Sequence, residues 1–344
     1  MVVEYTLPGF GTKTNGRCNT VLFADHCPDC HTTELKHYKC KNWECPVCYH
    51  SSASRGGERI ADRLYGGYLA YRSIGIDPGP MNHLVFSMPS SEYESFEDLS
   101  LRDQRRLISK YAKMVGVSGG VSIIHPKRIK DEYKVPVGLA LQDLGVDTGS
   151  LWEGVHLNAL DLDSWLDYTT GGLHIHVVGY FRIKMKSNDF EELTGWTYKN
   201  ITWEKRHKPE DKESVRRIAS YLLTHHSIVK GKQSFSYFGL LSNGKLTKTT
   251  RTERVDKECP ECSSQMYKVS VNSEERLQGL LDGTFRMCVD QFSIKSRLRT
   301  IRNYYDVRPP RGVKVSPKDD PRLRAWKVAH GYYVVPPEVG IPLT

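Results

Sequence analysis

One short segment, residues 172–180, limits the possible folds and functions of this chain more than any other: Gly-Leu-His-Ile-His-Val-Val-Gly-Tyr. Its β-branched residues favour a strand. Alternate side chains of a strand point to the same face, so His174 and His176 lie side by side. Ile175 and Val177 then pack on the opposite face. Two adjacent imidazoles are a ready pair of metal ligands, and a histidine pair packed in a core is the alternative.

A helix is predicted further along, starting near residues 209–211, where Pro-Glu-Asp forms a typical helix N-terminus. Tyr221 and His225 are one turn apart on it and share a face. A metal held by a facing strand would polarise a phosphodiester there, and the tyrosine would attack it in line. The alternative is a packing tyrosine, with His225 and His226 placed favourably at the helix C-terminal dipole.

Cysteines are concentrated near the start: six of the nine lie within the first 48 residues. The odd number argues against a disulfide framework and favours metal binding. Two Cys-x-x-Cys pairs separated by fourteen residues predict a structural zinc ribbon. The predicted ligands are Cys27, Cys30, Cys45 and Cys48. Further donors nearby leave the ligand set open: Cys18, Cys40, His26, His31 and His37.

A third Cys-x-x-Cys pair, Cys259 and Cys262, lies far from the others. It forms half of a zinc site, with Cys288 as a candidate third ligand. The sequence leaves open whether this pair binds a second zinc ion.

The net charge of +9 favours an anionic partner. Residues 131–170 carry eight acidic groups and one lysine, a net charge of −7, so the rest of the chain has a net charge of +16. No apolar run reaches the ~18 residues of a membrane helix, and no secretory leader is visible, which predicts a cytoplasmic protein without a membrane partner.

We expect an α+β chain in three parts. Residues 1–55 form the zinc ribbon, residues 56–250 a catalytic domain with an acidic insertion at 131–170, and residues 251–344 a basic region that binds DNA. Within the catalytic domain, Ser100 and Asp103 predict a helix start. Gly119-Gly120 is expected to end that helix, and Asn243-Gly244 predicts a hairpin turn.

The order of these motifs resembles that of the HUH endonucleases, named for a histidine-hydrophobe-histidine strand. Within them it is most similar to prokaryotic, especially archaeal, plasmid or virus rolling-circle replication initiators. The three matching segments are residues 83–89 (His-Leu-Val-Phe-Ser-Met-Pro), 173–178 and 219–225. The resemblance covers about residues 80–240.

This resemblance implies an antiparallel sheet of about five strands flanked by helices, with Mg²⁺ or Mn²⁺ bound by His174 and His176. It implies that Tyr221 forms a 5′-phosphotyrosine and frees a 3′-hydroxyl that primes the host polymerase. His225 is the implied third ligand. The alternatives are His156, Asp161, Asp163 and Asp167. Thr224 departs from the family, since many initiators carry a lysine there.

No second tyrosine lies one turn from Tyr221, so the chain resembles the single-tyrosine class. Termination then requires a second subunit, as in a dimer on DNA, another strand-transfer route, or water. The expected partners are single-stranded or hairpin origin DNA, a host polymerase and a helicase. Candidate DNA-binding residues are Arg216, Arg217, Arg297, Arg299 and Arg302. A transposase or relaxase, or a non-catalytic zinc-ribbon regulator, remains an alternative.

Overall fold

The structure is a computed structural model that describes residues 6–11, 16–133, 168–201, 211–229, 235–254, 258–285 and 299–308. Its helices are α1 (Tyr49–Arg72), η1 (Ser90–Glu92, a 3₁₀ turn), α2 (Tyr93–Asp98), α3 (Leu101–Met114), α6 (Ser187–Thr194), α7 (Lys212–Leu223) and α8 (Glu274–Leu281). Its strands are β1 (Val21–His26), β2 (Thr33–His37), β3 (Met81–Ser87), β4 (Val117–Ile129), β5 (Thr169–Phe181), β6 (Thr197–Ile201), β7 (Phe235–Gly239), β8 (Leu246–Arg254), β9 (Tyr267–Ser270) and β10 (Arg299–Val307).

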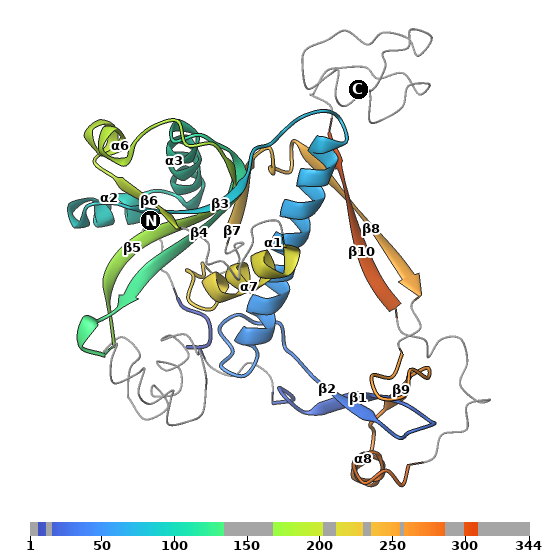
Figure 1. Ribbon diagram of the computed structural model, residues 1–344. Helices are drawn as coiled ribbons and strands as arrows, with labels where there is room; N and C mark the ends of the chain where they lie inside the picture. Colours follow the sequence, from blue (N-terminus) through green and yellow to red (C-terminus); the bar gives the residue numbers. More distant parts are fainter. Residues whose placement is uncertain are drawn as a thin grey trace, which may run out of the picture.

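A five-stranded antiparallel sheet in the order β6-β3-β5-β4-β7 forms the centre of the fold (Figure 1). The predicted α+β class, with such a sheet flanked by helices, is therefore confirmed. β5, the strand of the histidine pair, lies in the middle of the sheet. Gly119 and Gly120 lie inside β4, so the prediction that they end the preceding helix is wrong. That helix ends at Met114, and Gly116 turns the chain with φ 105°.

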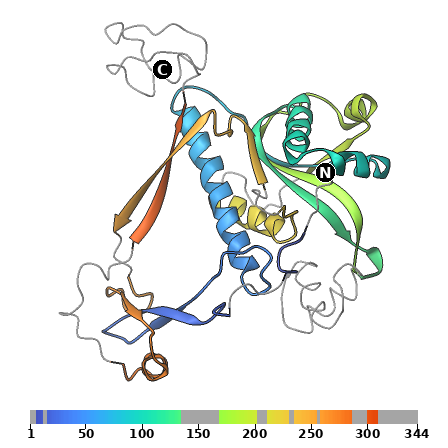
Figure 2. The ribbon, with the colours of Figure 1, turned by 180° about the vertical axis from the view of Figure 1, so that it is seen from behind.

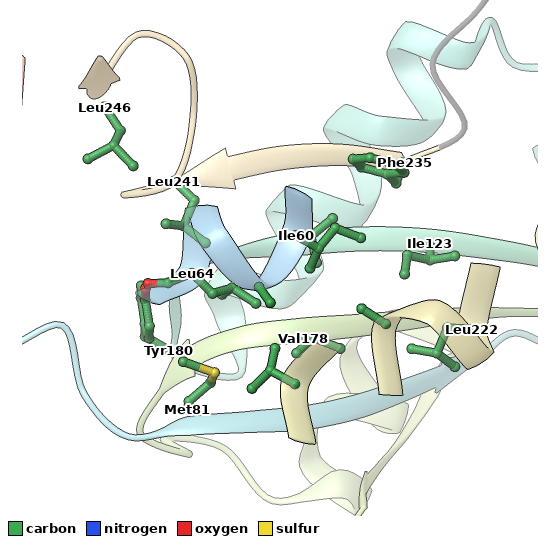
Figure 3. Packing of buried hydrophobic residues seen from close by; sticks show 14 of the residues in the cluster. Ile60, Leu64, Met81, Ile123, Val178, Tyr180, Leu222, Phe235, Leu241 and Leu246 are labelled. Carbon is green, nitrogen blue, oxygen red and sulfur yellow. The ribbon is translucent and has the colours of Figure 1, made fainter. Parts of the chain in front are cut away.

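Helices cover both faces of this sheet. α1 and α7 pack on one face, over a buried cluster that includes Ile60, Leu64, Val178 and Leu222 (Figure 3). α2, α3 and α6 cover the other, where Ile175 and Val177 of β5 are buried as predicted; the remaining members include Phe86, Ile108, Phe190 and Trp196. The alternation along β5 therefore places the two histidines on the α1 and α7 side.

Local capping signals set the starts of two helices. The Ser100 hydroxyl accepts a hydrogen bond from the Asp103 N–H at the start of α3. The Asp211 carboxylate accepts from the N–H groups of Glu213 and Ser214 at the start of α7. Side-chain caps of this kind satisfy the free N–H groups of a first turn. Both predicted helix starts agree with the structure.

Two smaller sheets complete the described part of the chain. β1 lies between β2 and β9 in a three-stranded sheet, and β8 pairs with β10 in a two-stranded ribbon (Figure 2). Segments predicted to lie in separate parts, 1–55 and 251–344, therefore share one sheet. The predicted hairpin at Asn243-Gly244 is wrong, because β7 pairs with β4 whereas β8 pairs with β10. Its turn instead connects two different sheets.

Most of the acidic insertion, residues 134–167, lies outside the described residues. None of the helices in the described ranges is both long enough and apolar enough to cross a membrane.

Candidate metal centre

Three histidines meet on the middle of the central sheet. His174 and His176 lie on β5, and His125 of β4 lies directly opposite His174 in the antiparallel register. Opposite residues of an antiparallel pair share a face. One ligand nitrogen from each of the three rings lies within 4.8 Å of the others, so this group could hold a metal ion.

Each ring of the group uses one nitrogen in a hydrogen bond that orients it. His174 donates from Nδ1 to the Gly172 carbonyl at 2.6 Å, and His125 donates from Nε2 to the Leu222 carbonyl at 2.9 Å. The Nδ1 of His176 bonds to His83 Nε2 at 2.7 Å. Metal-binding histidines typically use their second nitrogen in this way. The ligand nitrogens would then be Nδ1 of His125 and Nε2 of His174 and His176.

One buried atom directly supports this assignment. His125 is fully buried, and its Nδ1 has no hydrogen-bond partner among the described residues. A buried polar atom without a partner costs free energy unless something occupies its lone pair. A bound cation would fill this role.

Burial also keeps these imidazoles neutral. It lowers the pKa of His174 to about 4, and that of the neighbouring His83 to about 4. Burial, with the surrounding histidines adding to it, lowers the pKa of His125 and His176 well below the usual value. Only neutral imidazole can bind a metal, so the group is ready to bind at neutral pH.

The C-terminal turn of α7 is attached to this group. The carbonyls of its last three residues each accept a hydrogen bond: Tyr221 from Thr224, Leu222 from His125 and Leu223 from His226. Helix ends leave such carbonyls unsatisfied unless side chains supply donors. Thr224, at the position where the resembled family often has lysine, therefore caps the helix.

Tyr221 is accessible and close to the histidines. Its side chain is 47% exposed. Its ring centroid lies 4.9 Å from that of His225, and His225 lies 4.3 Å from His125. The exposed Tyr221 ring is therefore separated from the candidate metal group by the His225 ring alone.

The structure brings together most of the catalytic residues predicted from the sequence. His174 and His176 belong to the metal group, and His225 lies against it, but His125 completes the three. The sequence analysis missed His125, although it follows Val121 and Ile123 at strand spacing. The other predicted alternatives lie outside the described residues: His156, Asp161, Asp163 and Asp167.

The cysteines form two groups rather than one. Cys45 and Cys48 lie with Cys18 and Cys40, and Cys27 and Cys30 lie with Cys259 and Cys262. Each group could hold a zinc ion. The four cysteines predicted as one ligand set are thus divided between two sites, and Cys288, considered as a partner of the third pair, lies outside the described residues.

The first cysteine group lies at the start of α1. Cys48 is the N-cap residue of that helix, and the N–H of Tyr49 donates to the Cys45 carbonyl at 3.0 Å. α1 in turn packs along α7 (Figure 1). This group therefore anchors the helix that supports the tyrosine helix.

The predicted DNA-binding arginines are only partly described. Arg216 and Arg217 both form ion pairs with Glu213 on the same helix, so this one carboxylate balances half of their combined charge. Arg299 and Arg302 lie on β10, opposite Arg254 and Arg251 in the register. Arg297 lies outside the described residues.

Comparisons with known proteins gave no match: no family model fits the sequence, and no curated protein or solved structure shows significant similarity to it.

Proposed function

We propose that this chain is a metal-dependent single-strand DNA nickase of the HUH type, which initiates rolling-circle replication through Tyr221. The observation that carries the proposal is the position of Tyr221. It is half-exposed and lies in the last turn of α7. The carbonyl of the following residue, Leu222, accepts a hydrogen bond from His125. The tyrosine is thus accessible to a substrate beside three neutral histidines, of which His125 is buried and His174 and His176 are partly buried.

The donor set indicates which ion fits. Three imidazole nitrogens suit a transition metal better than Mg²⁺, which prefers oxygen ligands. Of the two ions expected from the sequence, Mn²⁺ is therefore the better match. When bound, the ion would polarise the scissile phosphate and neutralise the charge that develops on it.

The chain's own residues would perform the transfer. The Tyr221 hydroxyl gives up its proton to solvent, its oxygen forms a bond to phosphorus, and the bond from phosphorus to the 3′-oxygen breaks. The released 3′-oxygen takes up a proton, so the products are a 5′-phosphotyrosine and a 3′-hydroxyl that primes a host polymerase. The sequence contains no helicase motif that we identify, so unwinding is assigned to a partner. The net charge of the chain, +9, supports DNA as its substrate.

The test is a nicking assay on labelled single-stranded DNA from the replicon that carries the gene, with Mn²⁺ present. Wild-type protein is expected to form a covalent DNA adduct, and Tyr221→Phe is expected to form none. Tyr304→Phe is the matched control, because Tyr304 is also exposed (40%) but lies on β10. The adduct should form with Tyr304→Phe as with wild type.

Two results would refute the tyrosine chemistry, and a third would refute the role in replication. Equal cleavage by wild type and Tyr221→Phe would exclude the tyrosine as nucleophile. If the protein binds DNA but forms no adduct with any fragment of the replicon, a non-catalytic zinc-ribbon regulator is favoured. Cleavage at the ends of a mobile element, rather than at an origin hairpin, would instead assign the same chemistry to a transposase.

A further inference from the structure

The second cysteine group joins distant parts of the chain. Cys27 Sγ lies 3.5 Å from Cys262 Sγ, although the two residues are 235 positions apart, and Cys30 Sγ lies 3.4 Å from both Cys259 and Cys262. Sulfurs around a tetrahedral zinc ion, at Zn–S distances of ~2.3 Å, are ~3.8 Å apart. A disulfide requires ~2.05 Å. The spacing therefore suits four thiolates around one ion.

The two halves of this group have the same local structure. Each is a Cys-Pro-acid-Cys turn, with Asp29 in one and Glu261 in the other. In the first, the His31 N–H donates to the Cys27 carbonyl at 3.0 Å; in the second, the Ser263 N–H donates to the Cys259 carbonyl at 2.9 Å. The matching backbone points both cysteine pairs at a common centre.

A second hydrogen bond is common to both turns. The Cys27 N–H donates to the Thr32 carbonyl at 2.9 Å, and the Cys259 N–H to the Ser264 carbonyl at 2.7 Å. In addition, the Thr32 hydroxyl lies 3.1 Å from Cys30 Sγ. A hydroxyl at this distance can donate to a thiolate, which is the form of cysteine that binds a metal.

Backbone strain occurs at these cysteines. Among the described residues, four non-glycine residues have a positive φ: Asn19, His31, Lys41 and Ser263. Each directly follows a cysteine of one of the two groups: Cys18, Cys30, Cys40 and Cys262. The left-handed conformation is unfavourable for residues that carry a Cβ, and least so for asparagine. Strain repeated only after these cysteines indicates that metal binding compensates for it.

Hydrophobic packing alone is small in this part of the molecule. The apolar cluster beneath the β2-β1-β9 sheet has three fully buried members, Ala24, Val269 and Leu280. A core of this size contributes little against chain entropy, and small modules of this kind depend on a metal or disulfides. The cysteines in this part of the chain are not disulfide-bonded.

We propose that Cys27, Cys30, Cys259 and Cys262 bind one structural Zn²⁺, separate from any ion of the Cys18 group, and that this ion clasps residues 258–285 to the N-terminal sheet. The clasp does not depend on the nickase activity. β8 ends at Arg254, four residues before Glu258, so the clasp also fixes the far end of the β8–β10 ribbon. The near end is fixed on α1, where Tyr305 contacts Gly66.

The clasp therefore closes a frame. α1, the β8–β10 ribbon and the β2-β1-β9 sheet form its three sides, as both views show (Figures 1 and 2). The Cys18 group lies at the corner between α1 and the sheet, and the clasp at the corner between the sheet and the ribbon. Without the clasp, residues 258–285 would be held by the β1–β9 pairing and by the small apolar cluster of Ala24, Val269 and Leu280.

Zinc content of the full-length protein, measured by elemental analysis, tests the clasp. The readout is the difference between variants, since the histidine group can also take zinc. Cys259→Ser/Cys262→Ser is expected to lose one zinc per chain, and so is Cys27→Ser/Cys30→Ser. Combining the two pairs should still lose only one. Cys45→Ser/Cys48→Ser is the matched control, and its loss should add to that of either pair.

Unchanged zinc content in Cys259→Ser/Cys262→Ser would overturn the proposal, as would a loss of two ions when the two clasp pairs are combined. A measurement on wild type covers the case of variants that do not fold. During stepwise chelation, thiol alkylation followed by mass spectrometry should label the four clasp cysteines in one step and the Cys18 group in another. Labelling of Cys27 and Cys30 together with Cys45 and Cys48, and apart from Cys259, would contradict the clasp.

Discussion

A single methyl group at Gly57 of α1 would test how Tyr221 is held. A Cβ at this position would lie 2.1 Å from the Ser220 hydroxyl oxygen, 2.7 Å from the Arg216 carbonyl oxygen and 2.7 Å from the Ser220 nitrogen. Two of these three atoms belong to the backbone of α7 and cannot rotate away. Ordinary contacts begin at 3.4 Å, so α7 would have to move by about 0.7 Å.

The expected cost follows from two opposing effects. Overpacking of this kind destabilises a protein by about 1–3 kcal/mol. Replacing glycine by alanine inside a helix stabilises the helix by about 1 kcal/mol. We therefore expect Gly57→Ala to lower the free energy of unfolding by roughly 1 kcal/mol. Ser220 directly precedes Tyr221, the proposed nucleophile, and a displacement approaching 1 Å can reduce a reaction up to ~10²-fold. Adduct formation should thus fall much more than stability.

The assay compares urea denaturation with the rate of DNA adduct formation under conditions where the variant is fully folded. Gly279→Ala in α8 is the control, because a Cβ there meets its nearest atom at 3.5 Å, an ordinary contact. This control should leave both readouts unchanged or slightly raise stability. If Gly57→Ala were as stable as wild type and equally active, the close approach of α1 to α7 would not position the tyrosine.

Three further predictions concern the histidines. His83→Phe should weaken Mn²⁺ binding about 10–100-fold in calorimetric titrations, because His83 orients His176; unchanged affinity would mean that the contact is only packing. His125→Ala should abolish the Mn²⁺ signal change in electron paramagnetic resonance, whereas His225→Ala should retain it, and the reverse result would make His225 the third ligand. Burial lowers the pKa of His226 to about 4, so on acidification the unfolded chain takes up the proton before the folded chain does. The stability that the neutral ring contributes is therefore present above about pH 6.5 and lost as the pH falls towards 4. That loss is about 3 kcal/mol, and His226→Gln should make the denaturation midpoint less dependent on pH over this window than in wild type, with the remaining dependence due to the other histidines whose pKa is lowered.

Local signals were sufficient for part of this site. The caps at Ser100 and Asp211 depend on residues two or three positions away, and the shared face of His174 and His176 follows from strand geometry alone. The sequence could therefore indicate two metal ligands and the tyrosine helix. The turn at Asn243-Gly244 shows the limit of local signals, because the strands on either side of it pair with other partners.

Pairing between distant strands determined the rest. His125 joins the candidate metal group only because β4 pairs with β5 in the register that places it opposite His174. Cys27 meets Cys262 only because β9 returns to pair with β1. Cys-x-x-Cys spacing predicts a pair of ligands but does not say which other pair completes the site. Equal spacing of three such pairs left the grouping undetermined.

The placement of Tyr221 in the last turn of α7 has an electrostatic reason. A helix C-terminus carries a partial negative charge, which favours a cation nearby. The His125 N–H that donates to the Leu222 carbonyl transmits this charge to the ring whose Nδ1 faces the proposed ion. Hydrogen bonding of this kind raises the basicity of a metal-binding histidine. In the proposed site, the same bond would strengthen a ligand and fix the backbone beside the proposed nucleophile, so metal affinity and tyrosine position should change together when the end of α7 is displaced.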